Sequence, residues 1–90
     1  MLTYEDCLAF CDLTEEEIEA ISQHEHIPAI VALELGQYLV QTEDGVRKIK
    51  RMILDDIDAA DKNGHQERYL ALKATLKHFV DTHPENPLID

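Results

Sequence analysis

Apolar side chains recur at steps of three and four along most of the chain, which is the spacing of one face of an α-helix. Two such stripes dominate the second half of the sequence. One stripe contains Val46, Ile49, Ile53, Ile57 and Ala60, and the other contains Tyr69, Leu72, Leu76 and Phe79. The stripes predict one helix over residues 43–63 and another over 66–82, and we expect the two helices to form an antiparallel hairpin.

Stop and start signals bound these two helices. Thr42 can cap the start of the first helix, because a threonine hydroxyl accepts a hydrogen bond from a free N–H of the first turn. Asn63-Gly64 ends it, since glycine readily adopts the left-handed conformation found just past helix ends. Pro84 ends the second helix because proline cannot continue the hydrogen-bond ladder.

The first half of the chain predicts shorter helices. Thr3 with Asp6 can cap a helix over about residues 4–12. Thr14 with Glu17 forms the sequence pattern of a capping box, in which two side chains bond reciprocally to backbone N–H groups. Leu13 and Ile18 flank this box as a hydrophobic staple, so a second helix is expected to begin at Glu15.

A third helix is expected to begin with Pro28 as its first residue and to run to about Gln41. Its apolar residues cover most of the circumference, so we expect it to be the central, buried helix. Ala29, Ala32 and Gly36 share one face of this helix, and their small side chains predict that a neighbouring helix approaches closely. The same helix carries Glu34, which would be a candidate acid or base if buried and a solvated residue otherwise.

The fold expected from these patterns is all-α, a compact bundle of about five helices. Three shorter N-terminal helices pack on the C-terminal antiparallel helical hairpin. Ninety residues are too few for two independent cores, so residues 1–83 are expected to form a single helical domain. Residues 84–90 are expected to form an extended tail.

The charge of the chain restricts its partners. Acidic residues number 19 against 8 basic residues, which gives a net charge of −11, and such a field repels nucleic-acid phosphates and anionic lipid surfaces. No apolar run reaches the roughly 20 residues needed to span a bilayer. Glu5 and Asp6 lie where a secretory signal would carry positive charge. These features predict a cytoplasmic protein that binds neither nucleic acid nor membrane.

The pattern with the most chemical interest is Cys7, Cys11, His24 and His26, because thiolates and imidazoles are the usual ligands of structural zinc. However, zinc fingers separate their two histidines by three to five residues, whereas one residue separates His24 from His26. The alternative is that both cysteines are reduced and pack as small apolar side chains, with the histidines at a helix end. We favour this alternative, which leaves no metal or other cofactor.

No motif of an enzyme is present. The glycines are scattered at positions 36, 45 and 64, so no phosphate-binding loop or nucleophile elbow can form. The chain also lacks the Glu-x-x-His spacing of helical carboxylate–histidine metal sites. We therefore expect a protein without catalytic residues.

The only basic cluster consists of Arg47, Lys48, Lys50 and Arg51. Cations are unfavourable near a helix N-terminus, and this mismatch could mark a binding patch. Acidic residues four positions away from most of these side chains favour a second interpretation, an exposed face with salt bridges such as Asp58–Lys62.

Three segments resemble short, uncharacterised all-helical bacterial proteins with no established function. The segments are Cys11-Asp-Leu-Thr-Glu-Glu-Glu-Ile-Glu-Ala-Ile, His24-Glu-His-Ile-Pro and Glu34-Leu-Gly-Gln-Tyr-Leu. The resemblance covers about the first 40 residues. It implies a helical protein of the bacterial cytoplasm and assigns no functional residue.

Two classes of function follow from the sequence. The first is a small, acidic, non-enzymatic protein–protein interaction module or homodimer, because a helix that is apolar nearly all round needs a covering surface. The alternative is a small zinc-binding or thiol-redox protein that uses Cys7, Cys11, His24 and His26. An acidic mimic of DNA is a weaker third hypothesis, since the acidic residues are scattered over all the predicted helices.

Overall fold

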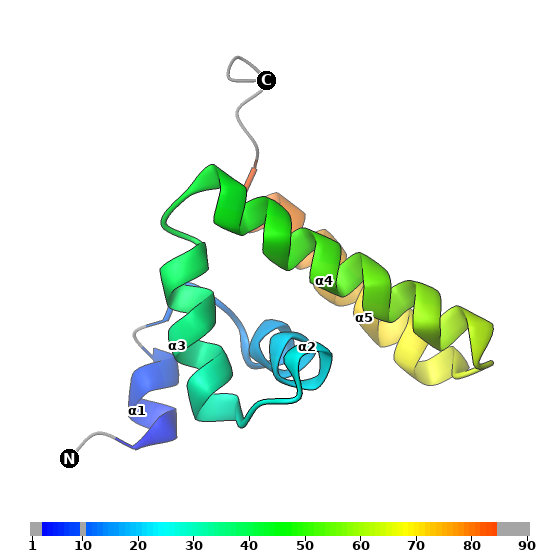
Figure 1. Ribbon diagram of the computed structural model, residues 1–90, viewed down its shortest axis with the longest axis horizontal. Helices are drawn as coiled ribbons and strands as arrows, with labels where there is room; N and C mark the ends of the chain where they lie inside the picture. The colour runs from blue at the N-terminus through cyan, green and yellow to red at the C-terminus, as the bar shows by residue number, and fades with distance from the viewer. Residues whose placement is uncertain (1–2, 10, 85–90) are drawn as a thin grey trace.

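The computed structural model describes residues 3–9 and 11–84 of the chain. These residues form helices and connecting turns without any strand, which confirms the all-α prediction (Figure 1). The five helices are α1 (Tyr4–Ala9), α2 (Glu15–Glu25), α3 (Ala29–Leu39), α4 (Glu43–Lys62) and α5 (Gln66–Thr82). Phe10 and the predicted tail beyond Pro84 lie outside the described residues.

Helices α4 and α5 lie side by side as the long antiparallel hairpin, and the three shorter helices gather on one side of it (Figure 1). This arrangement is the one that the sequence predicts. Helix α2 packs against α3, α4 and α5, whereas α1 packs against α3. The body measures 41 × 36 × 19 Å, so it is only about two helix diameters thick.

The predicted caps form hydrogen bonds. Thr14 Oγ1 accepts from Glu17 N at 3.2 Å, and Glu17 Oε1 accepts from Thr14 N at 2.9 Å, which completes the capping box of α2. Thr42 Oγ1 accepts from Gly45 N at 3.0 Å at the start of α4. Gly64 has a φ of +70° just past the end of α4, as the Asn63-Gly64 signal predicts.

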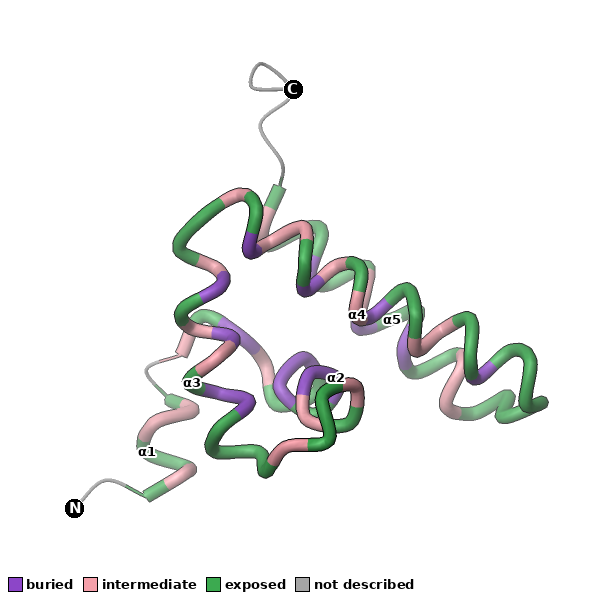
Figure 2. The backbone as a smooth tube through the Cα atoms, in the orientation of Figure 1, coloured by how far each residue is buried: buried purple, intermediate pink, exposed green. Residues whose placement is uncertain are grey.

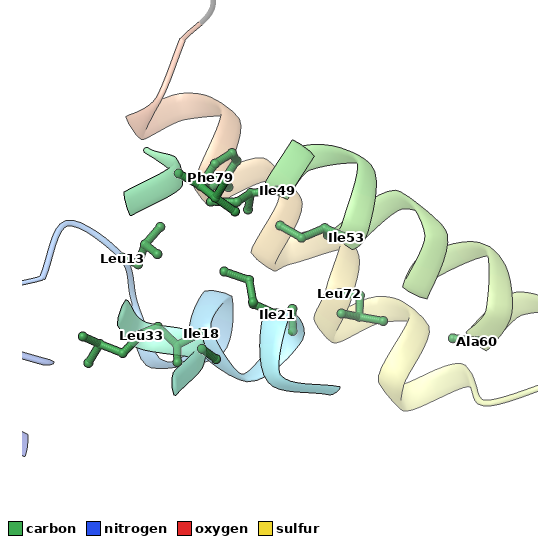
Figure 3. Close-up of a cluster of buried hydrophobic side chains, with 12 residues drawn as sticks. Leu13, Ile18, Ile21, Leu33, Ile49, Ile53, Ala60, Leu72 and Phe79 are labelled. Carbon is green, nitrogen blue, oxygen red and sulfur yellow. The ribbon is translucent and has the colours of Figure 1, made fainter. Parts of the chain in front are cut away.

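The core lies where α2 and the inner faces of α3, α4 and α5 meet (Figure 2). Figure 3 shows side chains of α2 turned toward the hairpin, with Ile18 and Ile21 fully buried. The hairpin contributes four large side chains to the core, those of Ile49, Ile53, Leu72 and Phe79. Both predicted stripes therefore face the interior.

The sequence predicts a central, buried third helix, but only one side of this helix is buried, so its predicted burial is wrong. Only Ala32, Leu33, Gly36 and Leu39 are buried in α3, while its outer face is exposed, with Tyr38 at 73%. Helix α3 packs against α1, α2 and α4, and these neighbours leave its side with Ile30, Val31 and Tyr38 uncovered.

The ends of α3 also differ from the prediction. Pro28 is the residue before the helix, with φ −62° and ψ 153°, and Ala29 is the first helical residue. The helix ends at Leu39 instead of continuing to about Gln41, because Thr42 must be extended to cap α4. The close approach at Gly36 is confirmed, since a Cβ atom there would meet the side chains of Leu13 and Ile21.

Among the described residues, no helix has both the length and the apolar content that crossing a bilayer requires.

Candidate functional site

A continuous surface groove runs between α2 and α5. It consists of two hollows of about 300 and 390 Å³. The hollows share Glu16, Ala71 and Thr75, which makes them one groove. Its other lining residues are Thr14, Glu19, Ala20, Glu67, Arg68, Leu72, Ala74 and His78.

The groove exists because the side chains at the seam between α2 and α5 are small. Its floor is built from Ala20, Leu72 and Thr75, all buried. Ala71 and Ala74 form the α5 wall and are exposed. An alanine extends only one carbon from the backbone, so two helices in contact at their ends leave a hollow between them along this wall.

Carboxylates line both edges of the groove. Glu16 and Glu19 project from α2 and Glu67 projects from α5, and all three are exposed. Gln23 Nε2 donates to Glu19 Oε1 at 2.9 Å. Within the described part of the chain, none of these three carboxylates forms a salt bridge with Lys, Arg or His, so their charge faces solvent.

A buried carboxylate contacts His78, which lines the groove. Glu17 is fully buried, yet both of its oxygens have partners: Oε1 accepts from Thr14 N, and Oε2 lies 2.9 Å from His78 Nδ1. A buried carboxylate without partners would be strongly destabilising. The contact with His78 therefore ties the start of α2 to the end of α5.

The groove also has a second charged group in its lining. Arg68 lines the groove and its Nη2 lies 3.9 Å from Asp56 Oδ2 on α4. That oxygen is buried and has no hydrogen-bond partner in the described residues. Burial raises the pKa of Asp56, although the charges of His24 and Arg68 act in the opposite direction.

His24 ties the end of α2 to α4. Its Nε2 lies 3.5 Å from Asp55 Oδ2, and its Nδ1 lies 2.9 Å from Glu25 Oε2. Partial burial of the ring disfavours the cation, but Glu25, Asp56 and Asp55 outweigh this effect and raise the pKa of His24 above its ordinary value. Helix α2 is thus joined to the hairpin by one histidine–carboxylate contact at each end.

The two cysteines and two histidines of the zinc hypothesis have separate surroundings. Cys11 Sγ lies 3.1 Å from Gln37 Oε1, and Cys7 is half-buried on α1. His24 contacts α4, while His26 is exposed and has a left-handed backbone at the end of α2. No group of three or more metal-ligating side chains occurs in residues 3–9 and 11–84.

The surroundings of Cys11 also bear on the thiol-redox hypothesis. Burial raises the pKa of the Cys11 thiol, and only the backbone N–H groups nearby act against this. A higher pKa lowers the fraction of the thiol that is present as thiolate. The thiolate is the form that attacks disulfides and binds metals. Both cysteines are free thiols.

The other candidate residues lie on the surface. Glu34, considered above as an acid or base, is exposed on α3. In the basic cluster of α4, Arg47 lies 3.3 Å from Asp44. The predicted Asp58–Lys62 pair forms at 3.1 Å.

Charge is unevenly distributed between the two halves of the fold. All 8 Lys and Arg residues lie in α4 or α5, and residues 1–42 contain none. The α2 edge of the groove therefore belongs to a part of the protein without Lys or Arg.

No family model, no curated protein and no solved structure matches this chain.

Sequence reasoning missed the groove. Its lining residues come from two helices separated by about 40 positions, and the Glu17–His78 contact joins residues 61 positions apart. The one available signal was Ala71 and Ala74 beside the apolar stripe of α5, where larger side chains would have closed the seam. That signal does not say which helix packs there.

Proposed function

We propose that this chain is a small, acidic, non-enzymatic protein–protein interaction module and that the groove between α2 and α5 is its docking surface. The observation that carries the proposal is an open groove between two packed helices, in which the exposed alanines Ala71 and Ala74 form one wall. Interaction grooves of this kind accept side chains of a partner protein.

The exposure of the groove favours a protein partner over a small molecule. Small-molecule sites are concave enough to cover most of the ligand. Here Glu16, Glu19, Ala71, Ala74 and His78 line the groove and are all exposed. A surface of this shape covers only one side of its ligand. It therefore fits a segment of another protein better than a small molecule.

The test is affinity capture with matched variants. Ala71→Trp fills the groove, whereas Ala59→Trp adds the same side chain at an exposed position of α4 outside it. We expect a protein that binds the wild type and Ala59→Trp, but not Ala71→Trp, and whose direct binding is reproduced with both proteins purified. Equal capture by all three forms would contradict the proposal.

A second candidate function is self-association through the outer face of α3. Ile30, Val31 and Tyr38 are exposed there by 40%, 43% and 73%, and apolar residues clustered on a surface are typical of interfaces. Sedimentation equilibrium should then show a dimer that Tyr38→Glu dissociates. A wild-type protein that is strictly monomeric at high concentration would exclude this candidate and leave the groove proposal intact.

A further inference from the structure

We infer that the segment which docks in the groove between α2 and α5 is a basic amphipathic helix of a partner protein, with Lys or Arg on both sides of an apolar stripe. This inference rests on the proposed function and specifies the chemistry of the partner. The inference follows from the order of charged and apolar surfaces across the groove, from the length of the groove and from the net charge of the protein.

Across its width near Glu67, the groove presents two carboxylates on the α2 edge, a mainly apolar floor, and one carboxylate on the α5 edge. Glu16 and Glu19 stand on the α2 edge, Ala20 and Leu72 on the floor, and Glu67 on the α5 edge. A helix presents the complementary order, with an apolar stripe at steps of three and four and charged residues on its two flanks. Only basic flanks place opposite charges next to both edges.

Two positive groups in the groove do not reverse this pattern. Arg68 is directed to Asp56, with a distance of 3.9 Å, and His78 lies 2.9 Å from the buried Glu17. Each is thus next to a carboxylate of this chain. The three edge carboxylates have no such basic partner in the described residues, so they remain available to the docked segment.

The length of the groove fits a helix of a few turns. Its lining residues on α5 extend from Glu67 to His78, which corresponds to about 17 Å at 1.5 Å per residue, or three helical turns. A partner helix would place about three apolar side chains on the floor over this length.

Net charge favours a foreign partner over a second copy. Each copy carries −11, so two copies repel one another at long range, whereas a basic segment is attracted. The attraction acts over about 8 Å at physiological ionic strength. Binding should therefore be fast at low salt and weaken as salt is added.

The test measures binding of a labelled model peptide of about 18 residues to the full chain by fluorescence anisotropy. The peptide carries Leu at helical steps of three and four with Lys on both flanks. Two control peptides have the same Leu positions with Glu in place of Lys, and the same composition in scrambled order. We expect the basic peptide to bind at least tenfold more tightly than either control and to become helical by circular dichroism.

Protein variants locate the binding site. Glu16→Gln with Glu19→Gln removes two edge charges, and Glu5→Gln with Glu34→Gln removes two exposed charges elsewhere. We expect the first pair and Ala71→Trp each to weaken binding at least tenfold, while the second pair and Ala59→Trp change it less than twofold. All four variants alter exposed positions, and circular dichroism confirms that they are folded.

Three outcomes would overturn the inference. They are no binding of the basic peptide, equal losses for the two charge-removing pairs, or equally tight binding of the acidic peptide. If the peptide fails while a captured protein still depends on Ala71, the partner chemistry is wrong and the docking groove stands. If Ala71→Trp changes neither measurement, both proposals fail.

Discussion

The two sides of α5 are packed in different ways. Toward α4, Phe79 is fully buried in one core cluster with Ile49 and Ile53 of α4, and the hollow beside it is only about 100 Å³, smaller than either hollow of the groove. Toward α2, the wall of α5 consists of Ala71 and Ala74, and a groove remains. One helix thus forms a filled seam with α4 and an open seam with α2.

The difference indicates how a 90-residue protein can be stable and still keep an open groove on its surface. Large apolar side chains in the filled seam, such as Ile49, Ile53 and Phe79, contribute burial that offsets the loss of chain entropy. The open seam is held at its end by polar contacts, above all by Glu17 with Thr14 and His78. Such contacts are directional, so they fix the distance between two helices without filling the space between them.

The largest effect is expected in the filled seam. Phe79→Ala should lower the free energy of unfolding by about 3–5 kcal/mol, because a buried ring is removed and a cavity remains. Leu70→Ala, at a position of α5 that is 62% exposed, should cost less than about 0.5 kcal/mol. Urea denaturation measures both, and similar losses for the two variants would refute the distinction between a filled and an exposed side of α5.

Two glycines should differ in their response to alanine. At Gly45, a Cβ atom would collide with the backbone carbonyl of Leu39, and at Gly36 it would meet the side chains of Leu13 and Ile21. A side chain can rotate away, whereas a helix backbone cannot do so without moving α3. We expect Gly45→Ala to cost about 3 kcal/mol and Gly36→Ala about 1 kcal/mol.

Thermal and urea denaturation of the two alanine variants decide this point. Gly36→Leu serves as a third measurement, since a long side chain leaves Leu13 no room and should be severely destabilising. If Gly36→Ala lowers the free energy of unfolding more than Gly45→Ala does, our ranking of the two close contacts is wrong.

In the open seam, the buried carboxylate should matter more than its exposed neighbour. Glu17→Ala removes the hydrogen-bond partner of Thr14 N and of His78. This substitution should lower the free energy of unfolding by about 2 kcal/mol. Glu16→Ala alters an exposed edge of the groove and should change stability by less than about 0.5 kcal/mol. Equal losses in urea denaturation would mean that the Glu17–His78 contact does not hold the seam.

The smallest effect concerns pH. Since the pKa of His24 is raised above the ordinary histidine value of about 6.5 in the folded protein, its interaction with Glu25, Asp56 and Asp55 stabilises the fold fully below about pH 6.5. The contribution disappears as the pH rises through the folded pKa. Exposed ion pairs contribute about 1 kcal/mol or less, so the stability difference between wild type and His24→Gln should be of that size.

The measurement is a series of urea denaturations between about pH 5.5 and about pH 8.5, a range that lies on both sides of the ordinary histidine pKa. The advantage of the wild type over His24→Gln should shrink toward the alkaline end. His65→Gln, at an exposed position before α5, should leave the pH profile unchanged. An advantage that grows with pH would show that His24 is neutral in the fold.

Much of the fold follows from local signals. The capping box at Thr14, the cap at Thr42 and the left-handed Gly64 each depend on residues within a few positions, and all three occur as predicted. The two stripes of the hairpin face the core for the same reason, since periodicity fixes which residues share a face. The candidate site could not be foreseen in this way, because Glu17 and His78 become neighbours only after α2 has packed on α5.

By itself, the sequence determined that the chain is helical, where most helices begin and end, and which face of each hairpin helix is apolar. These properties arise from backbone hydrogen bonding and side-chain spacing over one or two turns. Only the tertiary structure decided that the outer side of α3 stays exposed, and that small residues of α5 face α2 across a groove. The burial of a helix depends on how many neighbours surround it, and an apolar pattern does not specify that number.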